Sequence, residues 1–420
     1  MLDRRGFLQL GAAGIPAVLL TPTGARASRS GKKKRLAVVT TTWWYGSHAW
    51  HMATRFLVGY PVNGKWHHPD FEVVSAYVDQ IKENDLSQRR AKEFGFTVYP
   101  TIAEALRNGT DTLDVDCVLL IGEHGDYEIN EIGQKLYPRY RLFNGITKVF
   151  REEGKSVPVF NDKHLSWNYE WAEDMVAQSR ELKFPLLAGS SLPVTWRMPS
   201  VEMPYGAEIE EAMVVAYGPK DIYDFHALET LQCMMERRKG GETGVKSIHA
   251  LEGPTVWKYL EEKKWSPELF EACLSRSQTL QQTEEFSHRY PSPDLMKQLV
   301  ESPICYQLEY NDGTRATMML MNGLVRDFNF AARLKGRKEL LSTCFYLPPN
   351  PNVVYSAALM NNAEKMFMTG NAPYPIERTL LTSGMVQSAL QSLHLGQRKI
   401  ETPHLAVTYK PSRESTFYRQ

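Results

Sequence analysis

Two residues, Lys163 and His226, carry side chains that suit proton transfer at an alcohol oxygen. A lysine beside a reacting oxygen stabilises the negative charge that develops there, and a histidine accepts a proton near neutral pH. Asp221 and Asp224 lie close enough to His226 in the sequence to orient its ring. Simpler roles stay open. Lys163 would serve equally as a solvated partner of Asp162, and Asp224 as a first-turn acid that the helix dipole favours.

The sequence around Lys163 predicts a strand that ends at the candidate residues. Val157–Phe160 is a short apolar run, and Asn161-Asp162-Lys163 follows it directly. An amphipathic helical pattern leads to a second apolar run, Phe184–Ala188, which ends in the loop Gly189-Ser190-Ser191. Open α/β sheets bind ligands at the carboxyl ends of their strands, so we expect both segments to border a binding site.

Further apolar runs upstream predict the rest of this sheet. Arg35–Thr40, Phe71–Asp79 and Val115–Ile121 are typical of strands, and helical patterns separate them. This alternation predicts an α/β fold with a doubly wound parallel sheet. The segment Gly59–Asp70 is rich in turn-forming residues, and we expect it to be an inserted loop.

The turn after the first strand lacks the glycines of a dinucleotide-binding fold. Thr40-Thr-Thr-Trp-Trp-Tyr-Gly46 stands where the pattern Gly-x-Gly-x-x-Gly would be expected. Side chains at this turn would block the close backbone approach to a pyrophosphate, although Gly46 would allow a shifted turn. Asp79 ends the second strand, where an acid either holds a ribose hydroxyl or caps the next turn.

The stretch from Val157 to Thr195 resembles the Gfo/Idh/MocA oxidoreductases, which include glucose–fructose oxidoreductase and inositol dehydrogenase. Asp162-Lys163-His164 stands in the place of the family's Glu-Lys-Pro signature. The resemblance covers Arg35 to Pro199 and implies a Rossmann-like domain that binds NAD or NADP. The cofactor-binding residues that it implies are Thr41, Thr42, Gly46, Asp79, Glu123, His124 and Asp162.

The same resemblance implies roles for the candidate catalytic residues. Lys163 would be the electrostatic and proton-relay group in hydride transfer between a sugar or polyol and the nicotinamide. His226 matches a histidine that the family places near the start of a helix, and it would be the acid/base. Asp224 or Asp221 would be its orienting partner. The implied ligand is a small sugar or polyol, and the implied assembly is a homodimer or homotetramer.

The second domain begins near Pro199, and its patterns predict an α+β fold with an open mixed or antiparallel sheet. Ile304–Tyr310, Arg315–Met321 and Val325–Ala332 are typical of antiparallel strands. Asn311-Asp312-Gly313 predicts a tight hairpin turn between the first two of these strands. Thr379–Leu395 has the pattern of a last amphipathic helix.

Composition places the chain among ordinary globular proteins of two-domain length. There are 420 residues, and the formal net charge of +1 gives no electrostatic reason to expect nucleic acid or an anionic membrane as a partner. None of the five cysteines forms a Cys-x-x-Cys pair, so we expect no disulfide framework.

The first residues have the pattern of a twin-arginine export signal. Arg4-Arg5 precedes the apolar run Leu10–Leu20, and Ala25-Arg26-Ala27 suits a cleavage site. A membrane anchor is the alternative, but the apolar run is too short to span a bilayer well. We therefore expect a periplasmic or secreted protein with a signal at 1–27, a disordered linker at 28–34, and domains at 35–199 and 200–420.

Histidines and aromatic residues of the first domain favour two alternatives to an oxidoreductase. His48-x-x-His51 has acceptable spacing for a metal, but no cysteine or carboxylate cluster completes a ligand set, and we expect no metal. The alternatives are a non-redox, possibly metal-assisted, sugar-processing enzyme and a sugar-binding protein without a cofactor. Trp43, Trp44 and Tyr45 would be core residues or a stacking wall for a sugar ring.

Overall fold

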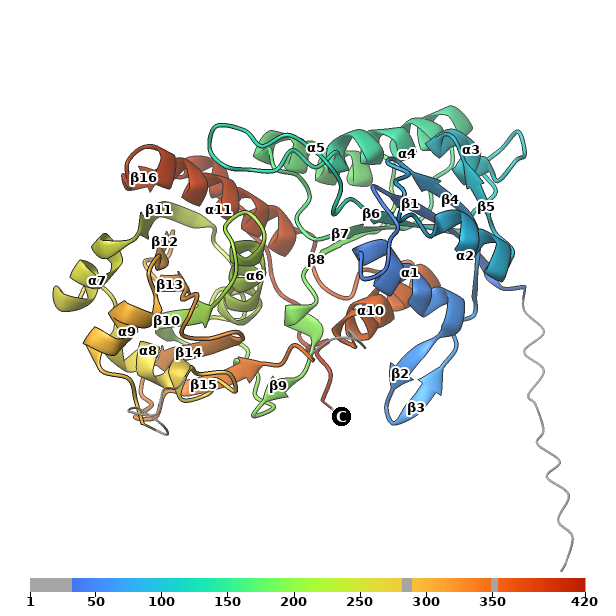
Figure 1. Ribbon diagram of the computed structural model, residues 1–420. Coiled ribbons are helices and arrows are strands. Elements are labelled where there is room, and N and C mark those ends of the chain that lie inside the picture. Colours follow the sequence, from blue (N-terminus) through green and yellow to red (C-terminus); the bar gives the residue numbers. More distant parts are fainter. Residues whose placement is uncertain (1–31, 282–288, 349–353, 420) are drawn as a thin grey trace, which may run out of the picture. The chain divides into compact units, whose positions relative to one another are not determined.

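The computed structural model describes residues 32–281, 289–348 and 354–419. These residues build two β-sheets and a small hairpin (Figure 1). The expected export signal at 1–27 lies outside the described residues, as does most of the expected linker, and Lys34 already belongs to the first strand. None of the helices in the described ranges combines the length and the apolar character that a membrane crossing requires.

The first sheet is fully parallel, as the alternating sequence pattern predicts. Its strands, in spatial order, are β5 (Thr97–Tyr99), β4 (Phe71–Val78), β1 (Lys34–Thr40), β6 (Cys117–Ile121), β7 (Val159–Asp162) and β8 (Leu186–Gly189). The chain winds from β1 first toward β5 and then toward β8. The direction therefore reverses between β1 and β6, and doubly wound sheets bind their ligands at such a reversal.

Helices cover both faces of this sheet. They are α1 (His48–Val58), α2 (Ser87–Phe94), α3 (Ile102–Arg107), α4 (Arg139–Glu153), α5 (Tyr169–Glu181) and α10 (Tyr355–Thr369). Alternate residues of β1 point to opposite faces. Ala37 and Val39 pack with α3, α4 and α5. Leu36 and Val38 pack with α1 and with α10, which comes from the C-terminal part of the chain.

The second sheet is mixed, as expected. Its strands, in spatial order, are β16 (Ile400–Glu401), β11 (Val245–Glu252), β12 (Ile304–Tyr310), β13 (Arg315–Leu320), β10 (Ile209–Ala216), β14 (Phe328–Leu334), β15 (Leu341–Phe345) and β9 (Arg197–Met198). The predicted hairpin of β12 and β13 forms. However, the third predicted strand, β14, does not pair with this hairpin, because β10 lies between β13 and β14. Residues 212–216 of β10 are all buried, which suits a central strand.

Helices also pack on both faces of the second sheet. The helices α6 (Tyr223–Met235) and α11 (Glu377–His394) share one core with it. The opposite core includes α7 (Pro254–Glu261), α8 (Pro267–Leu274) and α9 (Pro293–Leu299). Trp257 and Trp265 are buried in this second core. These helices cover part of a sheet face that would otherwise be free to pair with a second copy.

The expected inserted loop, Gly59–Asp70, contains a small hairpin. Its strands are β2 (Tyr60–Val62) and β3 (Lys65–His67). Nε2 of His67 lies 2.9 Å from Oε1 of Glu364, which ties the hairpin to α10. Two short 3-10 helices complete the fold, η1 (Leu192–Val194) and η2 (Pro403–Leu405).

Candidate active site

Lys163 lies directly after β7, at the strand end where the sequence predicts it. Its backbone adopts the left-handed conformation with φ of 61°, and His124 at the end of β6 does the same with φ of 69°. This conformation is costly for residues with side chains, and strained residues cluster at functional sites. Nζ of Lys163 lies 3.2 Å from Oε1 of Glu123, and their side chains are only 6 % and 3 % exposed.

Glu123 holds the lysine charge in position. Arg139 of α4 donates to the second carboxylate oxygen of Glu123. Burial alone would raise the pKa of Glu123, but the charges of Lys163 and Arg139 outweigh burial and lower it. Thr41 Oγ1 donates to the backbone carbonyl of Glu123 at 2.5 Å. The ends of β1, β6 and β7 are therefore joined around one buried ammonium group.

His48, the first residue of α1, faces the end of β7. Its Nδ1 lies 2.6 Å from Oδ2 of Asp162. The His48 side chain is 17 % exposed and that of Asp162 is 1 % exposed. Ser47 caps the helix by accepting a hydrogen bond from the Trp50 backbone N–H, which fixes where the helix begins. A histidine oriented by a carboxylate thus lies beside Lys163.

His226 occupies the first turn of α6, as the sequence predicts. Its Nδ1 lies 2.6 Å from Oγ of Ser190, and the Leu192 backbone N–H donates to the same Oγ at 3.1 Å. The hydroxyl of Ser190 and Nδ1 of His226 share one hydrogen bond, and its direction depends on the tautomer of the ring. Burial, and then the charges of Lys163 and His48, lower the pKa of His226 well below its ordinary value. The ring is therefore neutral at pH 7.

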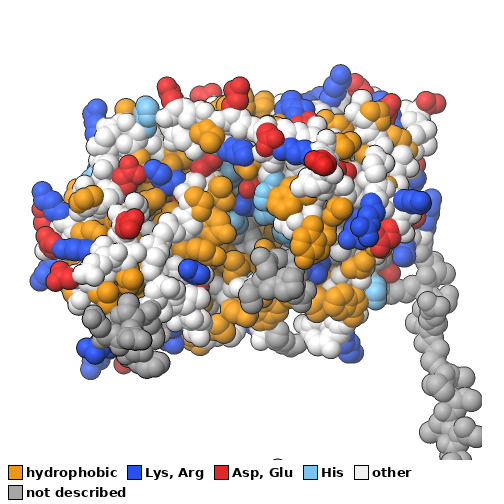
Figure 2. Space-filling view, in the orientation of Figure 1, with side chains coloured by type: hydrophobic (Ala, Val, Ile, Leu, Met, Phe, Trp, Pro, Cys, Tyr) orange, Lys and Arg blue, Asp and Glu red, His pale blue; other side chains and the backbone are white. Residues whose placement is uncertain are grey.

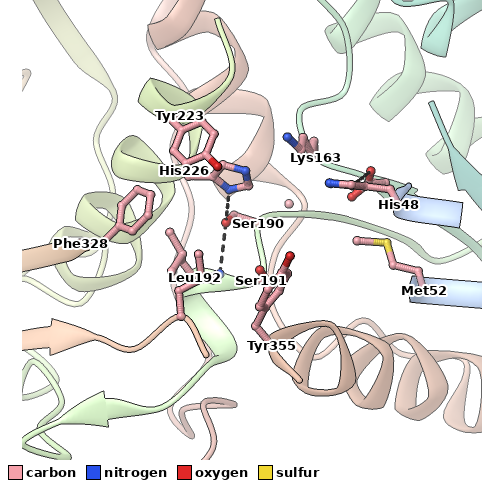
Figure 3. A pocket seen from close by; sticks show the side chains of 13 residues that line it. His48, Met52, Lys163, Ser190, Ser191, Leu192, Tyr223, His226, Phe328 and Tyr355 are labelled. Carbon is pink, nitrogen blue, oxygen red and sulfur yellow. Dashed lines mark hydrogen bonds and ion pairs between the residues drawn. The ribbon is translucent and has the colours of Figure 1, made fainter. Parts of the chain in front are cut away.

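One pocket is bordered by His48, Lys163, Ser190 and His226. Figure 3 shows His226 and Ser190 facing Lys163 and His48 across it. In the space-filling view, histidine side chains are visible in a hollow near the middle of the face shown (Figure 2). The rest of the lining is largely apolar or aromatic: Met52, Leu192, Tyr223, Phe328, Leu347 and Tyr355.

The two candidate acids near the start of α6 hydrogen-bond to groups other than His226. Asp224 accepts a hydrogen bond from the Tyr306 hydroxyl at 3.0 Å. Asp221 accepts one from the Lys135 backbone N–H at 2.7 Å. The structure therefore brings neither acid to the histidine that they were predicted to orient, and Ser190 occupies that place.

An Asp221→Asn variant should remove part of the pH dependence of stability. Burial, the largest influence, raises the pKa of Asp221 from 3.8 to about 7. Between these values the unfolded chain has released the proton that the folded chain keeps, so the free energy of unfolding falls as pH rises. We expect the variant to gain about 2–4 kcal/mol relative to wild type between pH 4 and pH 8. Urea denaturation at pH 4 and at pH 8 measures the free energy of unfolding of both proteins. If the difference between variant and wild type were the same at the two pH values, the prediction would be contradicted.

The turn after β1 is built from side chains where a dinucleotide fold has glycines. Thr41 and Thr42 are buried, and the fully buried Trp43 ring stacks on Phe96 with centroids 5.7 Å apart. Gly46 lies at the far end of the turn with φ of 88°. A pyrophosphate needs close contact with the backbone at this turn, and these side chains obstruct that contact.

The acid predicted to hold a ribose is already bonded within the chain. Asp79 accepts hydrogen bonds from the Tyr77 hydroxyl at 2.9 Å, the Tyr127 hydroxyl at 2.8 Å and Arg141 at 2.7 Å. Burial would raise the pKa of Asp79, but these donors lower it. With this acid engaged and the preceding turn filled, the described residues do not fit NAD or NADP bound as in a dinucleotide fold.

A group of histidines lies beside the pocket. The ring centroid of His48 is 4.8 Å from that of His51 and 5.1 Å from that of His124. Burial lowers the pKa of His51 well below its ordinary value, and burial followed by His48 lowers that of His124 to about 4. Both rings are therefore neutral at pH 7. Within the described ranges, no three His, Cys, Asp or Glu side chains are arranged to hold a metal ion.

Comparisons with known proteins identify the fold. No protein-family model and no curated protein matches the sequence. Solved structures, in contrast, match most of the chain. GenD2 from gentamicin A biosynthesis, solved in complex with NAD, has a TM-score of 0.55 and 12% identity, over 89% of this chain and 97% of that chain. The chain has the Gfo/Idh/MocA dehydrogenase fold.

Two inositol dehydrogenases share this fold. The scyllo-inositol dehydrogenase of Lactobacillus casei has a TM-score of 0.52 and 10% identity, over 88% of this chain and 98% of its own. The myo-inositol dehydrogenase of Corynebacterium glutamicum has a TM-score of 0.50 and 14% identity, with the same coverage. Folds host many reactions, so the reaction of this chain has to be argued from its pocket.

Several residues of the pocket were not predicted from the sequence to belong to the site. The spacing of His48 and His51 indicates a metal ligand or a histidine that hydrogen-bonds a sugar, and the place of His48 at a helix start after the first strand was a further usable signal. Ser190 was placed in a strand-end loop without a role. Tyr223 and Tyr355 line the pocket from α6 and α10, and no local pattern distinguishes them from core residues.

Proposed function

We propose that this protein is an enzyme that acts on a small sugar or polyol in the pocket between Lys163 and His226. One observation carries the proposal: a lysine, two histidines and a serine face an apolar wall that includes Tyr223 and Phe328. A sugar presents hydroxyl groups at its edge and an apolar ring face, and this lining complements both.

The reaction that these residues support best is proton transfer next to a carbonyl group. The ammonium of Lys163 is fixed by Glu123, so it can stabilise an oxyanion on the ligand with little rearrangement. His226 is neutral and is hydrogen-bonded through Nδ1 to Ser190, and we assign its Nε2 as the donor to a ligand oxygen. We therefore assign a non-redox isomerisation or epimerisation of a keto sugar or keto polyol.

A sugar or polyol oxidoreductase is the second candidate, with the chain as a divergent Gfo/Idh/MocA family member. The shared fold favours it, since GenD2 was solved with NAD and other matches are inositol dehydrogenases. This candidate requires NAD or NADP to be loaded before export and held tightly afterwards. The turn after β1 and the contacts of Asp79 would have to rearrange to admit it.

We also propose that the protein works outside the cytoplasm, in the periplasm or as a secreted protein. Arg4-Arg5, the apolar run Leu10–Leu20 and Ala25-Arg26-Ala27 support a twin-arginine signal that is cleaved and leaves no anchor. For the mature chain we propose domains at 35–199 and 200–420. We propose a homodimer or homotetramer as the assembly.

Calorimetric titration tests the proposed function. The probes are 2-keto-myo-inositol, D-fructose and myo-inositol, each added to wild type, to Lys163→Met and to the control Lys155→Met, which removes an exposed lysine outside the pocket. We expect saturable binding of at least one probe by wild type and by the control. The Lys163 variant should bind at least about tenfold more weakly, because it lacks one hydrogen bond from a charged donor. The proposal would be contradicted if the wild-type protein bound none of the three probes.

A further inference from the structure

We propose that His48, oriented by Asp162, is the base that removes the carbon-bound proton in this pocket. The assignment rests on the proposed function and deepens it, because it names the group that starts the reaction. His48 belongs to α1, at the end of the turn that lacks the dinucleotide glycines. The chain thus places a proton acceptor of its own at the sheet edge where the fold would otherwise hold a nucleotide.

The contact with Asp162 sets the tautomer of His48. Oδ2 of Asp162 lies 2.6 Å from Nδ1, and this carboxylate is buried with 1 % exposure. A carboxylate accepts hydrogen bonds, so Nδ1 carries the proton and Nε2 presents its lone pair. The ring is 17 % exposed and lines the pocket, so that lone pair is accessible to a ligand.

His226 lies across the pocket from His48 (Figure 3). Its Nδ1 is hydrogen-bonded to Oγ of Ser190. We assign Nε2 of His226 as the protonated nitrogen, so that one histidine takes a proton while the other donates a hydrogen bond to the ligand. Lys163 lines the same pocket and supplies the positive charge for the oxygen.

The proposed step is balanced without a co-reactant. Nε2 of His48 takes the proton from the carbon next to the carbonyl group, and the C–H electron pair forms the enediolate double bond. The carbonyl π electrons move to its oxygen, where Lys163 stabilises the negative charge. Return of the proton from His48 to the same carbon, after the enediolate has turned its other face to His48, gives an epimer. Return to the former carbonyl carbon, with the hydroxyl proton passing to the former carbonyl oxygen, gives an isomer. Asp162 stabilises the imidazolium that exists between the two transfers.

Other charged groups near His48 leave this role available. Lys163 opposes a positive charge on His48, whereas Asp162 and Glu123 favour it. His51 and His124 are neutral at pH 7, because burial lowers the pKa of each. A positively charged His48 would therefore be repelled by one cation, Lys163, and attracted by two anions, Asp162 and Glu123.

Hydrogen exchange from solvent tests the assignment. Wild type is incubated with 2-keto-myo-inositol or D-fructose in D₂O, and mass spectrometry follows deuterium in the recovered sugar. We expect His48→Gln to slow incorporation at least about 100-fold, the usual contribution of a positioned base. His68→Gln, at an exposed histidine outside the pocket, should leave the rate unchanged.

The outcomes separate this assignment from the proposed function. Incorporation by wild type and by His48→Gln at equal rates would overturn the role of His48 and leave the proposed function standing. No incorporation by wild type with either probe would overturn both. Binding in the calorimetric titration without incorporation would show that the pocket holds a sugar but performs no such proton transfer.

A measurement on the wild-type ring does not depend on how variants fold. Two-bond ¹H–¹⁵N correlation spectra of ¹⁵N-histidine protein report which ring nitrogen carries the proton. We expect His48 to be protonated on Nδ1, and Asp162→Asn, as a change in a positioning residue, to shift the population toward the other tautomer. A purely structural role of Asp162 would leave the tautomer unchanged. His48 protonated on Nε2 in wild type would overturn the proposal.

Discussion

A Lys163→Met variant should incorporate deuterium into 2-keto-myo-inositol about 10²–10³-fold more slowly than wild type. Methionine keeps the length and apolar stem of the lysine but removes the ammonium group. That group is fixed 3.2 Å from Glu123, next to the pocket, and its charge acts more strongly on the negative charge that develops during the reaction than on the neutral ligand. The rate of incorporation under saturating ligand should therefore fall more than the affinity does.

The matched control is Lys155→Met, because Lys155 is exposed on the segment that leads into the same strand. Its rate should equal that of wild type. Circular dichroism and thermal unfolding would establish that the Lys163 variant is folded. A folded variant that retains the wild-type rate would remove Lys163 from the chemistry, and His48 and His226 would then have to act without a fixed cation.

The second large effect is expected on stability, from Arg378→Met. Arg378 at the start of α11 donates through Nε at 2.8 Å and through Nη2 at 2.5 Å to the carboxylate of Glu236, which follows α6. The side chains are 8 % and 2 % exposed. Removing the guanidinium leaves Glu236 buried with only the Tyr409 hydroxyl, 2.9 Å away, as a side-chain donor among these contacts. We expect a loss of about 3–5 kcal/mol in the free energy of unfolding.

Urea denaturation followed by tryptophan fluorescence measures this loss. Arg398→Met provides the control, since Arg398 is exposed just beyond the same helix and its removal should change stability by less than about 0.5 kcal/mol. Adding Glu236→Leu to Arg378→Met should recover part of the loss, because no uncompensated charge then remains buried. Equal stability of wild type and Arg378→Met would show that the pair contributes nothing net to the fold.

The first sheet was readable from the sequence because its strands are short apolar runs that end in polar residues. Lys163 was found for this reason: the run before it is apolar, and strand ends of open sheets face ligands. The hairpin of β12 and β13 was readable from the turn at Asn311-Asp312-Gly313. In contrast, β10 was not singled out, and only its pairing with β13 and β14 fixes its central position.

Side-chain partners far apart in the sequence could not be read in the same way. Asp79 matched the expected ribose acid by position, yet Tyr127 and Arg141, which lie 48 and 62 residues further along the chain, engage it. His48 and Asp162 are 114 residues apart, and only the parallel arrangement of β1, β6 and β7 brings them together. The spacing of residues within a short segment cannot predict such contacts.

Asp224 shows that residues close together in the sequence need not contact each other. It lies two residues before His226, and on a helix residues at that spacing point to different sides. Its carboxylate bonds the Tyr306 hydroxyl of β12, and burial, the largest influence, raises its pKa to about 6. Nearness in sequence was therefore a weak argument for an orienting acid, whereas Ser190 reaches the ring from another strand end.

The most direct test of the account is native mass spectrometry of the folded protein, purified from the cytoplasm with residues 1–27 still present. A second spectrum would be taken after addition of NAD and NADP, and the denatured eluate would be searched for nucleotides. We predict the mass of the unmodified chain and no stoichiometric uptake of either nucleotide. A stoichiometric nicotinamide nucleotide on the folded protein would contradict the non-redox assignment, and the same pocket would then have to be tested for hydride transfer.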